Sequence, residues 1–138
     1  MAESSFQFTT PILLYAQIAV NQAFKNEQEI PFPMVFSVET VQQGEREATV
    51  ELTAKLGGDT DEYPYQIIVK EGARFRWTKE SDDKKDWLLK YNAPALLLSY
   101  LRPIVANLTA ASPFTSFSIP FIDFTKDDPS IVRTVTNG

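Results

Sequence analysis

The stretch "NAPALLLSYLRPIVANLTAASPFTSFSIPFIDF", Asn92–Phe124, decides what kind of fold this chain can form. Its first half predicts one long helix, with Asn92 as the N-cap, Pro94 in the first turn and an end before Pro113. Few residues of this helix carry polar side-chain groups, namely Ser99, Tyr100, Arg102, Asn107 and Thr109. A helix that packs on one sheet needs only an apolar stripe, so this sequence predicts two neighbours for the helix.

The residues before the helix alternate between apolar and polar and predict four strands. The first strand lies in residues 12–24, with Ile12 and Phe24 on the same face, and the second begins at Met34. The third is the clearest, because one parity is entirely apolar and the other polar, which is typical of an antiparallel sheet with one wet face. Its apolar parity consists of Ala48, Val50, Leu52, Ala54 and Leu56. The fourth runs from Tyr65 past Gly72, where we expect a bulge or a bend.

The expected fold class is therefore α+β, a four-stranded antiparallel sheet packed on one long C-terminal helix. The length of 138 residues and a hydrophobic content of 43% fit one globular domain, 1–138, with a core of about 6–124 and a polar tail, 125–138. A net charge of −5 argues against nucleic acid and against an anionic membrane surface as partners.

The residue types exclude several kinds of chemistry. The chain has no Cys and no His, so disulfides, thiolate chemistry and a catalytic His are excluded, and a metal could bind only to carboxylates. No GxSxG, P-loop, GxGxxG or metal-ligand cluster is present, and we expect neither an enzyme nor a cofactor or metal. The absence of Cys is compatible with a cytoplasmic protein, and the polar N-terminus gives no sign of a signal peptide. Arg102, Asn107 and two internal prolines argue against membrane insertion of the helix.

The apolar helix and the ribbon that follows it are the candidate binding surfaces. Either the fold itself covers the helix, or a second subunit packs on it; the limited material in one small domain favours a subunit interface. That interface would contain Leu97, Leu98, Tyr100, Leu101, Ile104, Val105 and Leu108. The rings of the ribbon either fill the core or form one lip of a hydrophobic groove, with phenylalanines near the first loop as the other lip. Such a groove would be lined by Phe24, Phe32, Phe36, Phe114, Phe117 and Phe121.

In the order of its segments the chain resembles the SecB family of protein-export chaperones and their SecB-like relatives. The segments that carry the resemblance are "ILLYAQIAVNQAF", "ATVELTAKLGG", "YQIIVKEGARF" and, above all, the stretch quoted first. In that stretch the family pattern corresponds to Ala93-Pro94, to Tyr100 with Arg102, and to the extended segment Ile119–Phe124. The resemblance covers residues 6–124.

This resemblance implies a homotetramer, assembled as a dimer of dimers, that binds unfolded or nascent polypeptides without ATP in the aromatic groove. Two departures accompany it. Residues 125–138 are short and polar where the family's secretion members end in a second helix. The acidic residues that dock the export motor SecA correspond to Ile18, Gln22 and Ile68, none of them acidic, which argues against docking on SecA.

Three functional hypotheses follow. The first is a cytoplasmic, non-enzymatic chaperone that holds unfolded chains, with protein export as one role that it could serve. The second is a dedicated interaction subunit, for instance an antitoxin-type partner, without general chaperone activity. The third is a small-molecule-binding α+β domain, which predicts a closed internal pocket.

Overall fold

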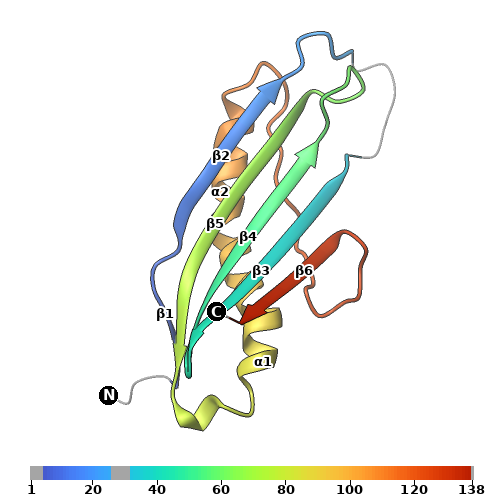
Figure 1. Ribbon diagram of the computed structural model, residues 1–138. Helices are drawn as coiled ribbons and strands as arrows, with labels where there is room; N and C mark the ends of the chain where they lie inside the picture. Colours follow the sequence, from blue (N-terminus) through green and yellow to red (C-terminus); the bar gives the residue numbers. More distant parts are fainter. Residues whose placement is uncertain (1–4, 26–31, 138) are drawn as a thin grey trace.

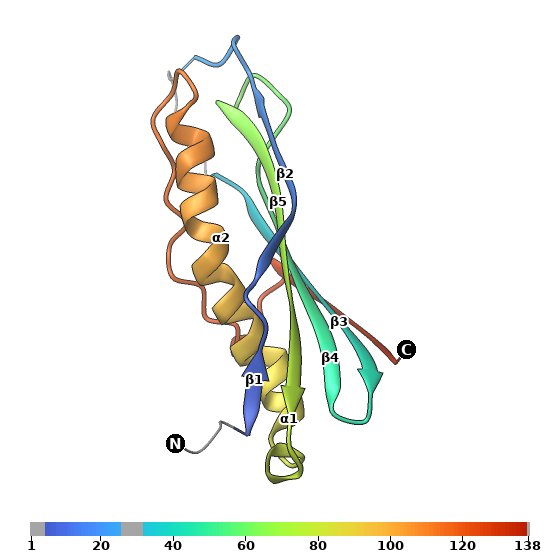
Figure 2. The ribbon, with the colours of Figure 1, turned by 90° about the vertical axis from the view of Figure 1, so that its left-hand side faces the viewer.

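The structure is a computed structural model that describes residues 5–25 and 32–137, in which a twisted sheet forms one layer and a long helix the other (Figures 1 and 2). The strands are β1 Phe6–Phe8, β2 Ile12–Val20, β3 Met34–Gly44, β4 Glu47–Gly57, β5 Tyr65–Trp77 and β6 Ile131–Asn137. The helical segments are η1 Lys79–Ser81, α1 Lys85–Trp87, the π-helical turn η2 Leu88–Asn92 and α2 Ala93–Ala110.

The sheet has the order β1-β5-β4-β3-β6, and β2 pairs with β5 on the same side as β1. The four expected strands are β2 to β5, and they pair antiparallel. The expected number of strands is wrong, because β1 and β6 bring the sheet to six. The strand β6 lies where we expected a polar tail. Its β-branched residues favour an extended backbone, and it pairs parallel to β3 at the sheet edge.

The alternation in β4 is confirmed, since all five of its inward apolar residues are fully buried. At Gly72 the ladder between β4 and β5 continues without a register shift. The irregularity lies instead in the neighbouring β2, between Leu13 and Tyr15. A Cβ on Gly72 would come within 2.8 Å of the Leu14 side chain, so the glycine lets β2 approach closely. Past this shift the parity of β2 changes, which the simple alternation in the sequence did not predict.

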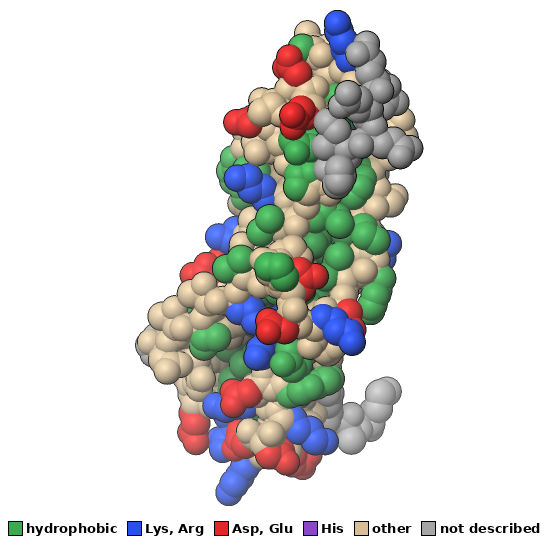
Figure 3. Space-filling model, turned by 90° about the vertical axis from the view of Figure 1, so that its right-hand side faces the viewer, with side chains coloured by type: hydrophobic (Ala, Val, Ile, Leu, Met, Phe, Trp, Pro, Cys, Tyr) green, Lys and Arg blue, Asp and Glu red, His purple; other side chains and the backbone are tan. Residues whose placement is uncertain are grey.

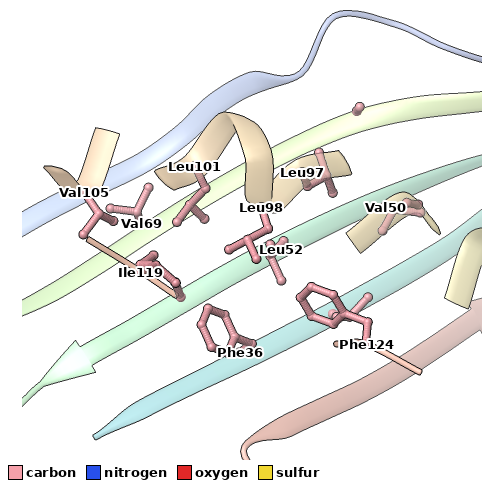
Figure 4. Packing of buried hydrophobic residues seen from close by; sticks show 14 of the residues in the cluster. Phe36, Val50, Leu52, Val69, Leu97, Leu98, Leu101, Val105, Ile119 and Phe124 are labelled. Carbon is pink, nitrogen blue, oxygen red and sulfur yellow. The ribbon is translucent and has the colours of Figure 1, made fainter. Parts of the chain in front are cut away.

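The helix α2 covers the inner face of the sheet and packs on β4 and β5. It does not begin at an N-cap: Asn92 has helical dihedral angles and the helical backbone runs on from α1 through η2. Its buried face includes Leu97, Leu101 and Val105, which Figure 4 shows among the side chains of the sheet. Ile119 and Phe124 close the core from the chain that returns after the helix (Figure 4).

One carboxylate lies on this apolar inner face. Glu71 of β5 is 3% exposed and stands between Leu13 of β2 and Leu52 of β4 in the register of the sheet. Its Oε2 has no hydrogen-bond partner among the described residues. Because burial disfavours the charged form, it raises the pKa of Glu71 above the ordinary value for a glutamate. The core therefore contains a polar group that costs stability.

Candidate functional site

A cavity with aromatic walls lies at the end of the molecule where α2 ends and β3 begins. Its volume is about 480 Å³, and its walls come from four segments that are far apart in the sequence. They are the loop after β2, the residues before β3, the start of β5 and the turn after α2. The lining residues are Phe24, Phe32, Pro64, Tyr65, Pro113, Phe114, Thr115, Ser116 and Phe117. Figure 3 shows hydrophobic side chains gathered over the upper half of the flank on the β3 side.

The rings of this aromatic cavity contact one another in two groups. Phe24 meets Phe114 edge-on, with ring centroids 5.3 Å apart. Phe32 lies 4.6 Å from Phe117 and meets Tyr65 edge-on at 5.7 Å. Such aromatic pairs contribute about 0.5–1.5 kcal/mol each beyond the area that they bury. These contacts join the segments that form the walls, and all four phenylalanines keep part of their surface accessible.

Buried hydroxyl groups fix the turn after α2. Thr109, in the last turn of the helix, is fully buried; its Oγ1 donates to the carbonyl of Val105 at 2.9 Å and accepts from the N–H of Phe117 at 2.8 Å. The Tyr65 hydroxyl donates to the carbonyl of Thr115 at 2.9 Å. Burial raises the pKa of Tyr65, while the neighbouring Thr109 hydroxyl acts in the opposite direction. The segment is thus tied both to the helix end and to the sheet.

A glycine makes room for Phe32. Gly57, the last residue of β4, has a φ of 73°, in the left-handed region that favours glycine. A Cβ there would lie 2.1 Å from the carbonyl oxygen of Tyr65 and 3.1 Å from the ring of Phe32. Its N–H donates to the carbonyl of Pro33 at 3.0 Å, which fixes the chain just before β3. The position of Phe32 in the wall therefore depends on this turn.

Four of the six phenylalanines expected in one groove lie together here: Phe24, Phe32, Phe114 and Phe117. Phe36 does not, because the parity of β3 directs it into the core, where it is 1% exposed and packs edge-on against Phe124. Phe121 does not line the cavity either. It lies further along the returning chain and is 81% exposed, which makes it the most exposed large apolar side chain among the described residues.

The sequence pattern did not identify the remaining lining residues. The sequence predicts Tyr65 only as the start of the fourth strand, and no neighbouring residue indicates that its hydroxyl donates to the opposite wall. Pro64, Thr115 and Ser116 lie in connections, where no periodicity exists to reveal which way a side chain points. The one signal that could have identified these residues is that they lie close to the phenylalanines of the two expected lips. That closeness can be recognised only once the topology is known.

The residues expected at a subunit interface divide into two sets. Leu97, Leu98, Leu101 and Val105 are buried in the chain's own core and have almost no surface left for a partner. The rest of the expected set, Tyr100, Ile104 and Leu108, retain accessible surface. The strand β2 carries a group of exposed large apolar side chains on both of its faces; they are Ile12, Leu13, Leu14, Tyr15 and Val20.

Within ranges 5–25 and 32–137, no group of three acidic side chains could hold a metal ion. Over the same ranges, no helix is both long and apolar enough to cross a membrane. The cavity itself offers mainly the apolar surfaces of rings, with Thr115 and Ser116 as polar members of its lining.

Comparisons with known proteins agree with this architecture. The family model for SecB, described as preprotein translocase subunit SecB, matches residues 13–126. A similar solved structure is the Mycobacterium tuberculosis Rv1957 SecB-like chaperone, in complex with a ChAD peptide from the Rv1956 HigA1 antitoxin. It shares 16% identity at a TM-score of 0.67, and the match covers 86% of this chain and 91% of that one. No curated protein matches the sequence.

A second solved structure is a protein of unknown function from Streptococcus agalactiae. Its identity is 16%, its TM-score is 0.42, and the match covers 87% of this chain and 100% of that one. The TM-score is too low for this likeness to carry an argument. The likeness to Rv1957 supports the fold, and the family model covers most of the chain.

Proposed function

The chain belongs to the SecB family, and we propose that it is an ATP-independent chaperone that binds apolar side chains of unfolded polypeptides in the aromatic cavity. The observation that carries this proposal is the cavity itself, about 480 Å³ between half-buried phenylalanines. That volume is in the range of ligand-binding pockets and can hold the large apolar side chains that an unfolded chain exposes. Binding to rings depends on buried area more than on directional bonds, so many sequences can bind.

The polypeptide nature of the ligand has further support. A solved protein with this fold, Rv1957, holds a peptide from an antitoxin. Thr115 and Ser116 add polar side chains to the otherwise apolar lining, and their hydroxyl groups can hydrogen-bond to a peptide backbone. Several weak sites in one assembly would hold a long client more tightly than one site alone.

We propose a homo-oligomer that buries the exposed side chains of β2. Leu13 and Tyr15 are each 48% exposed on an edge strand that carries no lysine or proline to block pairing with another strand. We expect the wild-type mass in light scattering to exceed that of one subunit at micromolar concentration. Tyr15→Lys should lower the mass, because it places a charge in the interface; a wild-type monomer would contradict the proposal.

The binding proposal can be tested with Phe114→Ala. Phe114 packs against Phe24 at the rim of the cavity, so truncation should remove binding surface while leaving the core intact. We expect weaker binding of a labelled unfolded test protein and less protection of that protein from aggregation. The matched control is Phe8→Ala, which removes an exposed ring from β1 at the other end of the sheet. Equal loss in both variants, or in neither, would refute a role for the cavity.

The dedicated interaction subunit remains the second candidate function, and the antitoxin peptide bound by Rv1957 favours it. It predicts one tight partner and poor binding to generic unfolded chains. Titration with several unrelated denatured proteins separates the two functions. Similar affinities for all of them support a general chaperone, and measurable binding to none supports a dedicated subunit.

A further inference from the structure

The C-terminal strand β6 differs from the rest of the sheet in how it is held. It is the last strand in the chain and the only described strand that pairs parallel with its neighbour, from Phe36 opposite Ile131 to Gln42 opposite Asn137. Parallel pairing is slightly less stable per residue than antiparallel pairing. Figure 1 shows it at the right-hand edge of the sheet, reached through an irregular loop.

The side chains of β6 contribute little burial. Ile131 is half-buried beside Phe36. Of the residues after it in β6, Arg133 is half-buried and the others are exposed. Val132 is 49% exposed and Val135 is 73% exposed. The strand is therefore held by its backbone hydrogen bonds to β3, by Ile131 and by one anchoring arginine.

That anchor is Arg133. Its Nη1 donates to the carbonyl of Lys90 in η2 at 2.6 Å, and its Nη2 donates to the carbonyl of Phe124. The guanidinium also lies over the ring of Tyr91, 5.3 Å from its centroid. Two carbonyl acceptors and an aromatic face together form a binding site that is specific for a guanidinium group. Here the guanidinium comes from β6, at the edge of the fold.

Beneath β6, on the side of α1 and η2, is a cleft of about 360 Å³. Val38 of β3, Leu89 of η2 and Val135 line its apolar part, with Asp86 and Lys90 also in its wall. Val135 packs little against the other walls of this cleft, since 73% of its surface is exposed. A larger apolar side chain at the same place would bury more surface.

We propose that the edge of β3 is a second binding site for extended polypeptide, which the chain's own β6 occupies in this structure. The partner is a segment with the pattern apolar-x-basic-x-apolar, as in Ile131, Arg133 and Val135, with a preference for a larger residue at the last position. It binds by strand addition, after displacing β6. This site is separate from the aromatic cavity and does not rest on the chaperone function proposed above.

An occupant within the same chain reduces the apparent affinity of any competitor. A short tether gives β6 an effective concentration in the millimolar range. If β6 is undocked in about 1% of molecules, a competing peptide binds about 100-fold more weakly than it would to a vacant edge. The strand β6 thus sets the affinity or concentration that a competing peptide needs. Only segments that resemble β6, or that are present at high local concentration, bind to the edge of β3.

The direct test is fluorescence anisotropy with a labelled peptide of residues 129–138. A chain that ends at Asp128 should bind it saturably and at least about tenfold more tightly than the full chain does. A peptide with leucine in place of Val135 should bind more tightly, and one with alanine in place of Arg133 more weakly. A folded truncated chain that does not bind the peptide overturns the proposal, and so does equal binding by a scrambled peptide.

A second variant decides the question if the truncated chain does not fold. Ser37 and Val132 are register partners on the outer face, away from the core, and the chain has no cysteine of its own. In Ser37→Cys/Val132→Cys, oxidation should lock β6 in place and abolish peptide binding, and reduction should restore the level of the full chain. Equal binding in both redox states refutes displacement. Phe114→Ala should leave this peptide's affinity unchanged, so failure of the aromatic cavity is distinguished from failure of this site.

Discussion

Replacing Thr109 by valine tests whether one buried hydroxyl holds the end of the helix against the aromatic cavity. Valine has nearly the same shape, so the change removes hydrogen bonds without opening a large void. Thr109 is fully buried, and its Oγ1 is the acceptor for the N–H of Phe117 at 2.8 Å. The carbonyl of Val105 loses a donor too, but it still belongs to the helix and can keep its backbone partner.

The expected cost follows from the N–H of Phe117, which is left without a partner. An unsatisfied buried donor costs about 1–3 kcal/mol. With a urea slope of about 2 kcal/mol per molar, the unfolding midpoint should fall by roughly 0.5–1.5 M. If Phe117 also loses its contact with Phe32, an aromatic pair of about 0.5–1.5 kcal/mol, affinity for an unfolded client should fall about twofold to tenfold.

The assay compares Thr109→Val with Thr109→Ser at one fixed protein concentration, because oligomerisation would otherwise shift the midpoint. Serine keeps the hydroxyl and loses the methyl group, so it isolates the effect of packing. We expect the serine variant to keep client affinity near the wild-type value and the valine variant to bind the client about twofold to tenfold more weakly. If valine is as stable as serine and binds client equally well, then the hydrogen bond to Phe117 does not position the cavity wall.

Glu71→Gln should raise the free energy of unfolding at about pH 8 by at least about 1 kcal/mol, since it keeps the shape of the side chain and removes the charge that burial disfavours. Because burial raises the pKa of Glu71, the stability that its protonated form contributes is complete below the ordinary glutamate pKa and is lost as pH rises through the folded-state value. Urea midpoints at about pH 4.5 and pH 8 should therefore differ less in the variant than in the wild type, and an unchanged difference contradicts this. Gly57→Ala should destabilise the fold by at least about 1–3 kcal/mol, because of the positive φ and the contact with the Tyr65 carbonyl. The control is Gly44→Ala, where the nearest atom to the new Cβ is 4.0 Å away; equal thermal midpoints for the two variants would rule out this account of Gly57.

The sequence by itself determined the two kinds of element and the layer that each belongs to. Alternation in β4 predicted five core residues, because successive side chains of a strand point to opposite faces of the sheet. All five are fully buried. The apolar run around Leu97 and Leu101 likewise predicted the long helix. Both patterns are local, and burial on one face is enough to impose them.

Only the tertiary structure decided which of the phenylalanines meet. Phe24, Phe32 and Phe114 come from three connections, where no periodicity fixes the direction of a side chain, and topology brings them to one end of the helix. Phe36 shares their chemistry but lies on the inward parity of β3 and became core. The strand β6 was missed for a related reason: its pairing depends on the free edge of β3, a partner almost a hundred residues away that no local pattern reveals.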